Sequence, residues 1–160
     1  MAPADSWSTE PLLEQRTTEF PYRHSTGETI GRFLAGLKEQ KKIWGQRVAG
    51  QGVVVPPHGY SEVDGSVGGE WVEVANRGVV IAFAKVHRPI ANMHPSNEPF
   101  AFVLVKLDGA DTALAHFVTQ GRDDLTVGSR VEAVWRSDEE RVGSLRDFSF
   151  RVVEPERGQA

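Results

Sequence analysis

The side chains that could catalyse a reaction or bind a metal are few in this sequence and widely spaced. There are no cysteines, so the chain has no thiolate metal ligands, thiol nucleophiles or disulfides. The serines lack a Gly-x-Ser-x-Gly or comparable nucleophile motif. No two histidines have the His-x-x-x-His spacing that would place both on one helix face; the five are His24, His58, His87, His94 and His116. The sequence therefore predicts no catalytic residue and no metal site.

Two of these histidines lie in predicted strands and admit a functional interpretation. His87 ends a strand and precedes Arg88, where it could meet an anionic ligand at a barrel mouth. An exposed histidine at a strand end is the simpler interpretation. His116 alternates with Leu114 and Val118, which favours a histidine in the core or at an interface with its hydrogen bonds satisfied. Catalysis by either histidine stays open as a less favoured hypothesis.

One cluster of positive charge lies near the end of a predicted helix and comprises Lys38, Lys41, Lys42 and Arg47. Such a cluster could meet phosphate groups or an acidic surface on a partner. Lysines near the end of a helix also stabilise it by opposing the helix dipole. The sequence favours neither interpretation, so both stay open.

The helix that would position this cluster is predicted over residues 25–43. Ser25 and Glu28 have the spacing of a capping box. An apolar stripe follows at positions i, i+3, i+4 and i+7, formed by Ile30, Phe33, Leu34 and Leu37. Such a stripe must be buried, and we expect it to face another protein. Trp44, at the helix exit among polar residues, is the tryptophan we expect at the same interface.

The rest of the chain has the pattern of a small β protein. Residues 44–69 are rich in glycine and proline and predict a compact connecting segment. The two-residue period of strands begins at residues 71–74, and five further strands are predicted over residues 79–87, 100–107, 112–119, 130–136 and 148–153. Five short strands suit a closed barrel, because closure removes exposed strand edges. We therefore predict a mainly β fold with a five-stranded OB-fold barrel over residues 70–154.

The two ends of the chain and its overall charge restrict the function. Residues 1–24 are predicted to form an extended arm, and residues 155–160 a flexible tail. No apolar run is long enough to cross a bilayer and no secretory signal is visible, so we expect a cytoplasmic protein without a membrane partner. The net charge of -4 argues against nucleic acid, because neutralising phosphates requires a surplus of Lys and Arg.

Several short segments, in their order and spacing, carry a resemblance to a known family. They are Phe33-Leu34-Ala35-Gly36-Leu37 leading to Trp44-Gly45-Gln46-Arg47, Val55-Pro56-Pro57, Glu70-Trp71 before Gly78-Val79-Val80, Pro99-Phe100, and Val127-Gly128-Ser129-Arg130-Val131. Together they resemble the small rubredoxin-like zinc-ribbon plus OB-fold proteins that accompany acyl-CoA thiolases, acyltransferases and steroid side-chain aldolases. The resemblance covers about residues 22–154.

The same resemblance identifies where this chain departs from its family. The family pattern places two Cys-x-x-Cys knuckles on either side of the Pro-Pro, and these supply four thiolates to a tetrahedral zinc ion. The matching positions here are Val48, Gln51, Ser61 and Asp64. A single carboxylate cannot hold a structural zinc ion. We therefore expect residues 44–69 to form a degenerate, metal-free zinc ribbon.

The resemblance implies a non-catalytic accessory subunit that docks on a thiolase-fold enzyme acting on acyl-CoA thioesters, such as a steroid side-chain aldolase. The two proteins would form a hetero-oligomer. This chain would bind no cofactor directly, since acyl-CoA would be the substrate of its partner. By analogy, the helix and ribbon would contact the partner through Ile30, Phe33, Leu34, Leu37 and Trp44. The barrel would help to shape the CoA entrance, with Lys41, Lys42, Arg47, His87 and Arg88 as the CoA-proximal residues.

A single-stranded nucleic-acid-binding OB-fold protein is the alternative from a different class. OB barrels bind single strands through aromatic stacking and a positive groove. The acidic balance of this chain disfavours that function. A salt-sensitive interaction with oligonucleotides would favour it.

Overall fold

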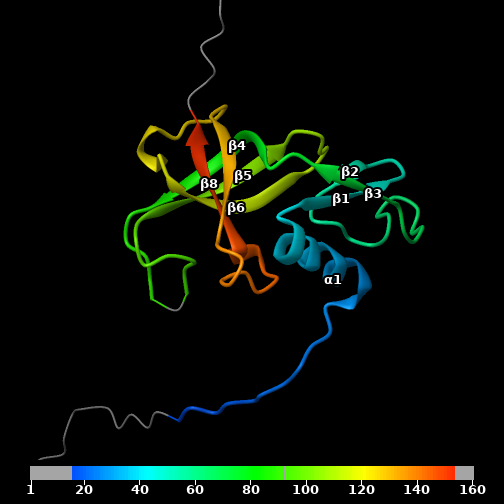
Figure 1. Ribbon diagram of the computed structural model, residues 1–160, viewed down its shortest axis with the longest axis horizontal. Helices are drawn as coiled ribbons and strands as arrows, with labels where there is room; N and C mark the ends of the chain where they lie inside the picture. The colour runs from blue at the N-terminus through cyan, green and yellow to red at the C-terminus, as the bar shows by residue number, and fades with distance from the viewer. Residues whose placement is uncertain (1–15, 92, 154–160) are drawn as a thin grey trace, which may run out of the picture.

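The computed structural model describes residues 16–91 and 93–153. Figure 1 shows a barrel of strands on one side and a smaller sheet on the other, with helix α1 lying below the smaller sheet. Residues 16–26 are exposed and lead into the helix without helix or strand structure of their own. The first part of the predicted arm and the predicted tail at residues 155–160 lie outside the described residues. Within the described part, no helix has the length and apolar character needed to cross a membrane.

Helix α1 is shorter than the sequence predicts. It spans Gly27–Ala35 and continues as a π-helical turn over Gly36–Gln40. Lys41 then adopts a left-handed conformation, with a φ of 54°, and ends the helix. The predicted end at residue 43 is therefore wrong by a few residues, and Lys41 and Lys42 lie after the helix rather than in its last turn.

The start of α1 also lacks the predicted capping box. Thr26 is the N-cap residue, and its side chain makes no capping hydrogen bond. Ser25 instead accepts a hydrogen bond at Oγ from the Gly27 N–H, at 3.2 Å. Packing holds the helix in place, because Phe33 and Leu37 are only 1% and 0% exposed and lie in the chain's own core.

Three strands after the helix form a small antiparallel sheet, which we call the ribbon sheet. Its strands are β1 (Ile43–Val48), β2 (Gly52–Val54) and β3 (Glu70–Val74), in the order β2-β1-β3. The turn between β1 and β2 has Gly50 at positive φ, a conformation that glycine adopts without steric cost. The sequence predicts residues 70–74 as the start of the barrel, but β3 pairs with β1 instead. The boundary between ribbon sheet and barrel therefore lies at residues 75–76.

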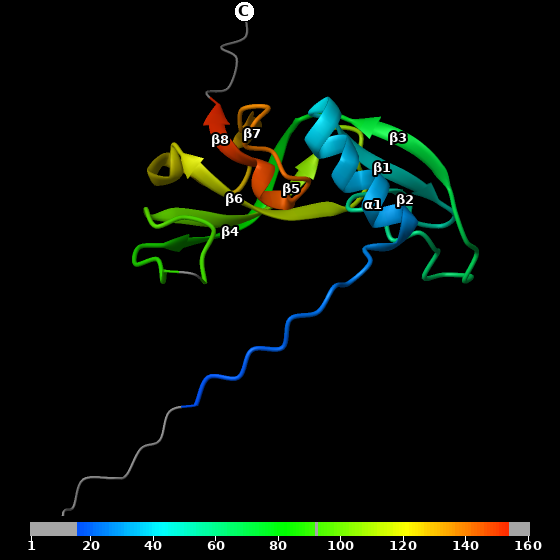
Figure 2. The ribbon, with the colours of Figure 1, turned by 60° about the horizontal axis from the view of Figure 1, so that its bottom comes forward.

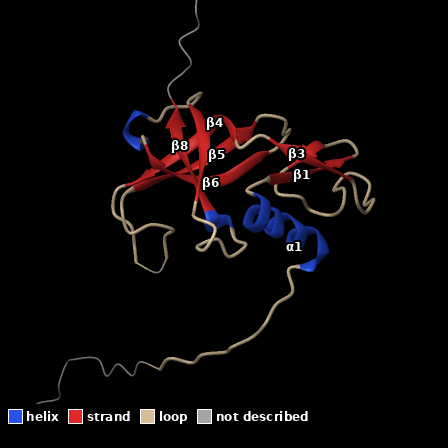
Figure 3. Ribbon diagram, viewed as in Figure 1, coloured by secondary structure: helices blue, strands red, loops and turns tan. Residues whose placement is uncertain are grey.

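The other five strands close into a barrel, in the order β4-β5-β6-β8-β7 with β7 returning to β4 (Figures 1 and 3). They are β4 (Arg77–Val86), β5 (Phe100–Leu107), β6 (Ala113–Gln120), β7 (Arg130–Trp135) and β8 (Phe148–Val153). Strands β6 and β8 pair in parallel, and the other neighbours pair antiparallel. This is the topology of an OB-fold, so the predicted fold class is confirmed.

A single apolar core joins all three parts of the molecule. It includes side chains from α1, from the ribbon sheet and from the barrel; the largest fully buried ones include Phe33, Leu37, Ile43, Phe100, Phe148 and Phe150. Burying each such side chain stabilises the fold by about 1.5–3 kcal/mol. Because the core is continuous, we expect the helix, the ribbon sheet and the barrel to fold as one unit.

Candidate functional site

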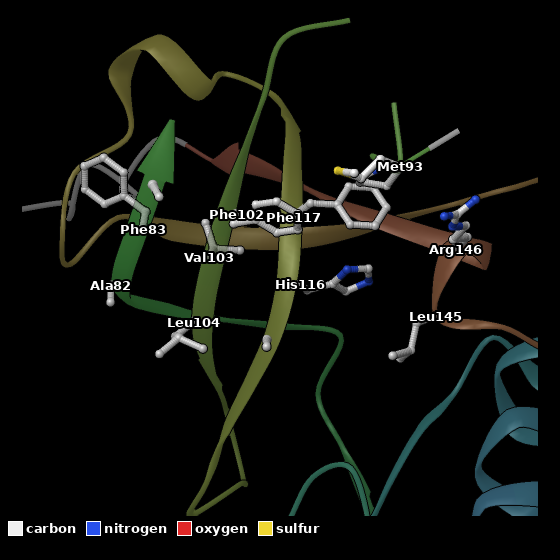
Figure 4. Close-up of a pocket in the computed structure, with 13 residues that line it drawn as sticks. Ala82, Phe83, Met93, Phe102, Val103, Leu104, His116, Phe117, Leu145 and Arg146 are labelled. Carbon is white, nitrogen blue, oxygen red and sulfur yellow. The ribbon is translucent and has the colours of Figure 1, made fainter. Parts of the chain in front are cut away.

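An open cavity of about 510 Å³ lies over strands β4, β5 and β6 of the barrel. Figure 4 shows its lining, with Phe102 and Phe117 side by side on β5 and β6. Along β5 buried and exposed residues alternate, so Ala101 and Val103 face the core while Phe102 and Leu104 point outward. The cavity therefore lies largely on the outer face of the barrel, where a polar surface is the usual arrangement.

The register of the strands explains why this face is hollow. Two rows of outward-facing residues cross the three strands, with Ala82, Leu104 and Ala115 in one row and Ala84, Phe102 and Phe117 in the other. Alanines flank Leu104 on both sides, whereas Phe102 has Ala84 on one side and Phe117 on the other. Phe102 is 44% exposed and Leu104 is 40% exposed. Large apolar side chains grouped on a surface in this way are typical of a binding site.

The loop between β4 and β5 forms one border of the cavity through Met93 and Pro95. His94 fixes this loop, because its Nδ1 accepts a hydrogen bond from the Ile90 N–H at 2.8 Å. The imidazole also packs edge-on near Phe102, with 6.2 Å between the ring centroids. The role of His94 is therefore to position the loop.

His116 lies at the inner end of the cavity and is only 5% exposed. Its ring packs edge-on against Phe148 and Phe150, with centroid distances of 4.1 and 5.4 Å. Burial lowers the pKa of His116 to about 3, so the imidazole is neutral at neutral pH. The expected core position is confirmed, but the expected satisfaction of its hydrogen bonds is wrong, because Nε2 is buried without a partner among the described residues. Figure 4 shows the ring directed toward Leu145 and Arg146.

Leu145 and Arg146 reach the cavity from a short 3-10 helix, Leu145–Asp147, that precedes β8. Ser144 and Asp147 form a capping box at its start. The buried Asp147 carboxylate accepts hydrogen bonds from the N–H groups of Val142, Gly143 and Ser144, at 3.1, 2.7 and 3.1 Å. Burial raises the pKa of Asp147, but these bonds outweigh it and hold the pKa below its ordinary value. The turn that presents Arg146 is thus rigidly fixed.

Arg146 provides the charge of the cavity. It is exposed, and the other lining residues are apolar apart from the neutral His116. No described residue makes an ion pair or hydrogen bond with its guanidinium. The lining contains no carboxylate, hydroxyl or thiol. Because a nucleophile with a neighbouring base is missing from this lining, the arrangement is suited to binding rather than to catalysis.

The predicted CoA-proximal residues fall into two separate groups. Lys41, Lys42 and Arg47 lie near the end of α1 and in the ribbon sheet, whereas His87 and Arg88 are exposed in the loop after β4, which extends away from the ribbon sheet (Figures 1 and 2). The first group is paired with acids: Lys41 with Asp138 at 2.9 Å, Lys42 with Glu73 at 2.6 Å and Arg47 with Glu70 at 3.4 Å. His87 and Arg88 belong to the loop that borders the cavity.

The predicted partner-interface residues are only partly accessible. Phe33 and Leu37 are buried inside the chain, so in this arrangement they anchor the helix and cannot contact a partner. Ile30, Leu34 and Trp44 are half-buried. The Trp44 indole packs against the helix and donates a hydrogen bond from Nε1 to Gln40 Oε1, at 3.3 Å. These three residues keep some surface that a partner could cover.

A more exposed apolar surface lies on residues 56–69, the ribbon loop, between β2 and β3. Val63 and Val67 are 68% and 88% exposed, and Tyr60 is exposed as well. The loop is ordered by its own backbone, since Tyr60 and Val67 form a β-bridge and the Ser61 N–H donates to the Ser66 carbonyl at 2.8 Å. The sequence did not predict this surface, because isolated apolar residues among glycines are also typical of an ordinary turn.

The residues at the family's zinc positions do not fit a zinc site. Val48 is buried and has no donor atom. The Ser61 hydroxyl is already engaged, since it donates to the Ala49 carbonyl at 3.3 Å and accepts from the Asp64 N–H at 3.4 Å. Gln51 contributes an amide, which leaves Asp64 as the one carboxylate of the set. Among the described residues, no group of three or more His, Cys, Asp or Glu side chains could hold a metal ion.

The fold and the cavity together define an OB-fold domain that carries an N-terminal helix and a ribbon sheet and has an apolar binding face. Within this class, residues 71–136 match the family model of the ChsH2 C-terminal OB-fold domain. The family resemblance seen in the sequence is thereby confirmed.

Two solved structures share the fold. A chain of the "Ltp2-ChsH2(DUF35) aldolase" is 21% identical with a TM-score of 0.59, and the match covers 81% of this chain and 98% of that one. A protein of unknown function from the DUF35 family of Sulfolobus solfataricus is 19% identical with a TM-score of 0.56, and the match covers 80% and 87% of the two chains. No curated protein matches the sequence.

Proposed function

We propose that this chain is a non-catalytic accessory subunit that docks on a thiolase-fold enzyme acting on acyl-CoA thioesters, such as a steroid side-chain aldolase. The main support is the shared architecture, because the similarity spans 98% of a chain from an aldolase whose name joins two proteins, Ltp2 and ChsH2. In this proposal the two subunits form a hetero-oligomer in the cytoplasm. Residues 44–69 are then a zinc ribbon that has lost its metal.

The surface offered for docking is formed by the ribbon loop together with the start of α1. Val63 and Val67 are the most exposed apolar residues of the ribbon loop. The backbone of Gly59 in this loop packs closely against Thr29 of α1, which makes the two segments one surface. Exposed apolar groups gathered in this way are typical of a protein–protein interface. Ile30 and Leu34 would extend the contact along the helix.

In the same proposal the barrel helps to shape the CoA entrance of the partner. His87 and Arg88 are exposed at the barrel end of the molecule, where they are available to CoA phosphates. Lys41, Lys42 and Arg47 would first have to leave their acidic partners Asp138, Glu73 and Glu70. His87 and Arg88 are therefore the better candidates for a direct contact with CoA.

Co-expression and co-purification with candidate thiolase-fold proteins from the same genome test the proposal. We expect a stable complex with the wild-type chain. The double variant V63D/V67D should lose at least tenfold in affinity, because it places charges in an apolar interface. Val127→Asp changes an exposed valine on the barrel and serves as the matched control. A wild-type chain that stays monomeric beside every such partner contradicts the proposal.

One observation favours the alternative of single-stranded nucleic-acid binding. Phe102 and Phe117 are accessible on the second and third barrel strands, which carry oligonucleotides in other OB-folds. Arg146 is the one cation in the lining of this cavity, so a positive groove is missing. Fluorescence anisotropy with a labelled oligothymidine distinguishes the two functions, since only the alternative gives binding that weakens steeply with salt.

A further inference from the structure

We propose that the cavity over β4, β5 and β6 binds an amphipathic carboxylic acid, whose apolar body lies on Phe102 and Leu104 and whose carboxylate binds Arg146 and His116. This site goes beyond the accessory function proposed above and does not depend on it. The cavity and the docking surface of the ribbon loop share no residue.

The position of the cavity supports a ligand site. OB-folds bind their ligands on the face of the second and third strands, between the loop that joins strands one and two and the loop that joins strands four and five. Here the corresponding elements are β5, β6, the loop at residues 87–99 and the loop at residues 136–147. All four contribute to the lining, through Phe102, Phe117, Met93 and Leu145 among others.

The size and lining of the cavity point to an apolar body for the ligand. Its volume of about 510 Å³ lies within the range of pockets that hold small organic molecules. Phe102 and Phe117 provide flat aromatic surfaces, and Met93 adds a flexible side chain that adapts to a ligand's shape. The alanines of β4 and β6 leave room beside them. A sugar or a peptide backbone would lose its hydrogen bonds on this surface.

The polar end of the cavity indicates an acidic head group. Buried Nε2 of His116 has no partner among the described residues, and a buried polar atom without one is unusual in a folded protein. In the tautomer with its proton on Nε2, the imidazole can donate a hydrogen bond to a carboxylate. Arg146 carries a positive charge that no described residue neutralises. A carboxylate satisfies both groups, whereas a cation would be repelled by Arg146.

Binding of dodecanoate to the purified full chain, below its micelle concentration, tests this proposal. Isothermal titration should give one site per chain, and NMR titration should shift the amide signals of Phe102, Ala115, Phe117 and Leu145. Dodecan-1-ol is the matched neutral probe, and we expect it to bind about tenfold more weakly because it lacks the charge. Equal affinity for the acid and the alcohol overturns the proposal.

Variants separate the contributions of the head group and the body. Arg146→Gln, at an exposed position, should weaken dodecanoate about tenfold and leave dodecan-1-ol unchanged. Leu104→Asp should weaken both probes, since it places a charge where the apolar body lies. Val127→Asn, outside the cavity, should change neither. An Arg146→Gln variant with unchanged dodecanoate affinity would exclude the assigned head-group site, whatever the result for the thiolase-fold partner.

Discussion

Asp111 and Val53 exchange two hydrogen bonds across the junction between the barrel and the ribbon sheet. The Val53 N–H donates to Asp111 Oδ2 at 2.7 Å, and the Asp111 N–H donates to the Val53 carbonyl at 2.8 Å. Thr112 repeats the arrangement with Val55, since its hydroxyl accepts from the Val55 N–H at 2.8 Å and donates to the Val55 carbonyl at 3.1 Å. Val53 lies in the edge strand β2 and Val55 directly follows it. Residues of the β5–β6 loop of the barrel therefore satisfy backbone groups that no further strand pairs.

We therefore expect this junction to contribute to stability in place of a metal. Asp111→Ala removes the acceptor of the buried Val53 N–H and should lower the free energy of unfolding by about 1–2 kcal/mol. Asp111→Asn keeps an acceptor oxygen and should lower it less. Urea unfolding followed by circular dichroism measures both variants. If Asp111→Ala unfolds at the wild-type urea concentration, the junction does not hold the ribbon sheet.

The free energy of unfolding should decrease as the pH is lowered, because folding buries His116 in its neutral form. Its pKa is about 3 in the folded protein and 6.5 in the unfolded chain, so below pH 6.5 the unfolded state binds the extra proton. The free energy of unfolding should then decrease by about 1.4 kcal/mol per pH unit between pH 6.5 and pH 3. Urea unfolding at about pH 7 and about pH 5 should show a loss of about 2 kcal/mol.

The matched variant for this measurement is His116→Phe, which keeps an aromatic ring in the core and cannot be protonated. Four carboxylates have a pKa lowered from 3.8, those of Asp64, Asp108, Asp138 and Asp147. Between about pH 7 and about pH 5 these groups are ionised in both the folded and the unfolded state, so they contribute little to the measured difference. The comparison uses the slope with pH, because the variant also changes the packing. If the free energy of unfolding changes equally with pH in the wild type and in His116→Phe, groups other than His116 cause the pH dependence.

Arg141 connects the end of α1 to the loop between β7 and β8. Its buried guanidinium donates to the Lys38 carbonyl at 2.7 Å, to the Arg136 carbonyl at 3.0 Å and to Asp138 at 2.7 Å. Arg141→Met should lower the free energy of unfolding by about 2–4 kcal/mol, because it leaves carbonyl groups without partners. In Arg141→Lys a single ammonium group cannot reach both the Lys38 and the Arg136 carbonyl, so its free energy of unfolding should lie between those of the wild type and Arg141→Met. Thermal unfolding followed by near-ultraviolet circular dichroism checks the order; a methionine variant as stable as the wild type contradicts it.

The barrel strands could be predicted because their signal is local. The strands are short segments rich in Val, Phe and other apolar residues, separated by stretches that contain Pro, Gly and Asp, and the predicted bounds agree with β4 to β8 within two residues. The partner of β3 is set by register with β1, which is distant in sequence. The helix end depends on Trp44 packing against Gly36, which leaves no room for a side chain there. Neither the β1–β3 pairing nor the packing of Trp44 against Gly36 could be predicted from the sequence pattern of a single segment.

The cavity could not be predicted from the sequence, because it too depends on residues that are distant along the chain. Phe102 and Leu104 have the residue types of ordinary strand positions, and only the tertiary structure shows that no other element covers them. Arg146 lies in a stretch that reads as a polar loop, and the capping box of Ser144 and Asp147 turns it toward β6. The core position of His116 could be predicted from alternation, but its missing partner could not, because that depends on every neighbour of Nε2.

The ribbon loop should fold without metal. The Ser61 hydroxyl joins this loop to the β1–β2 turn through hydrogen bonds with the Ala49 carbonyl and the Asp64 N–H, in the place where zinc joins the two segments in the family. We expect elemental analysis to find no stoichiometric zinc and a chelator to leave the melting temperature unchanged. Ser61→Ala should lower the free energy of unfolding by about 1–2 kcal/mol, because the buried hydroxyl bonds are lost. Ser66→Ala, at an exposed position of the same loop, is the control and should cost less. One zinc ion per chain, or unfolding on chelation, would show that other residues hold a metal in this loop.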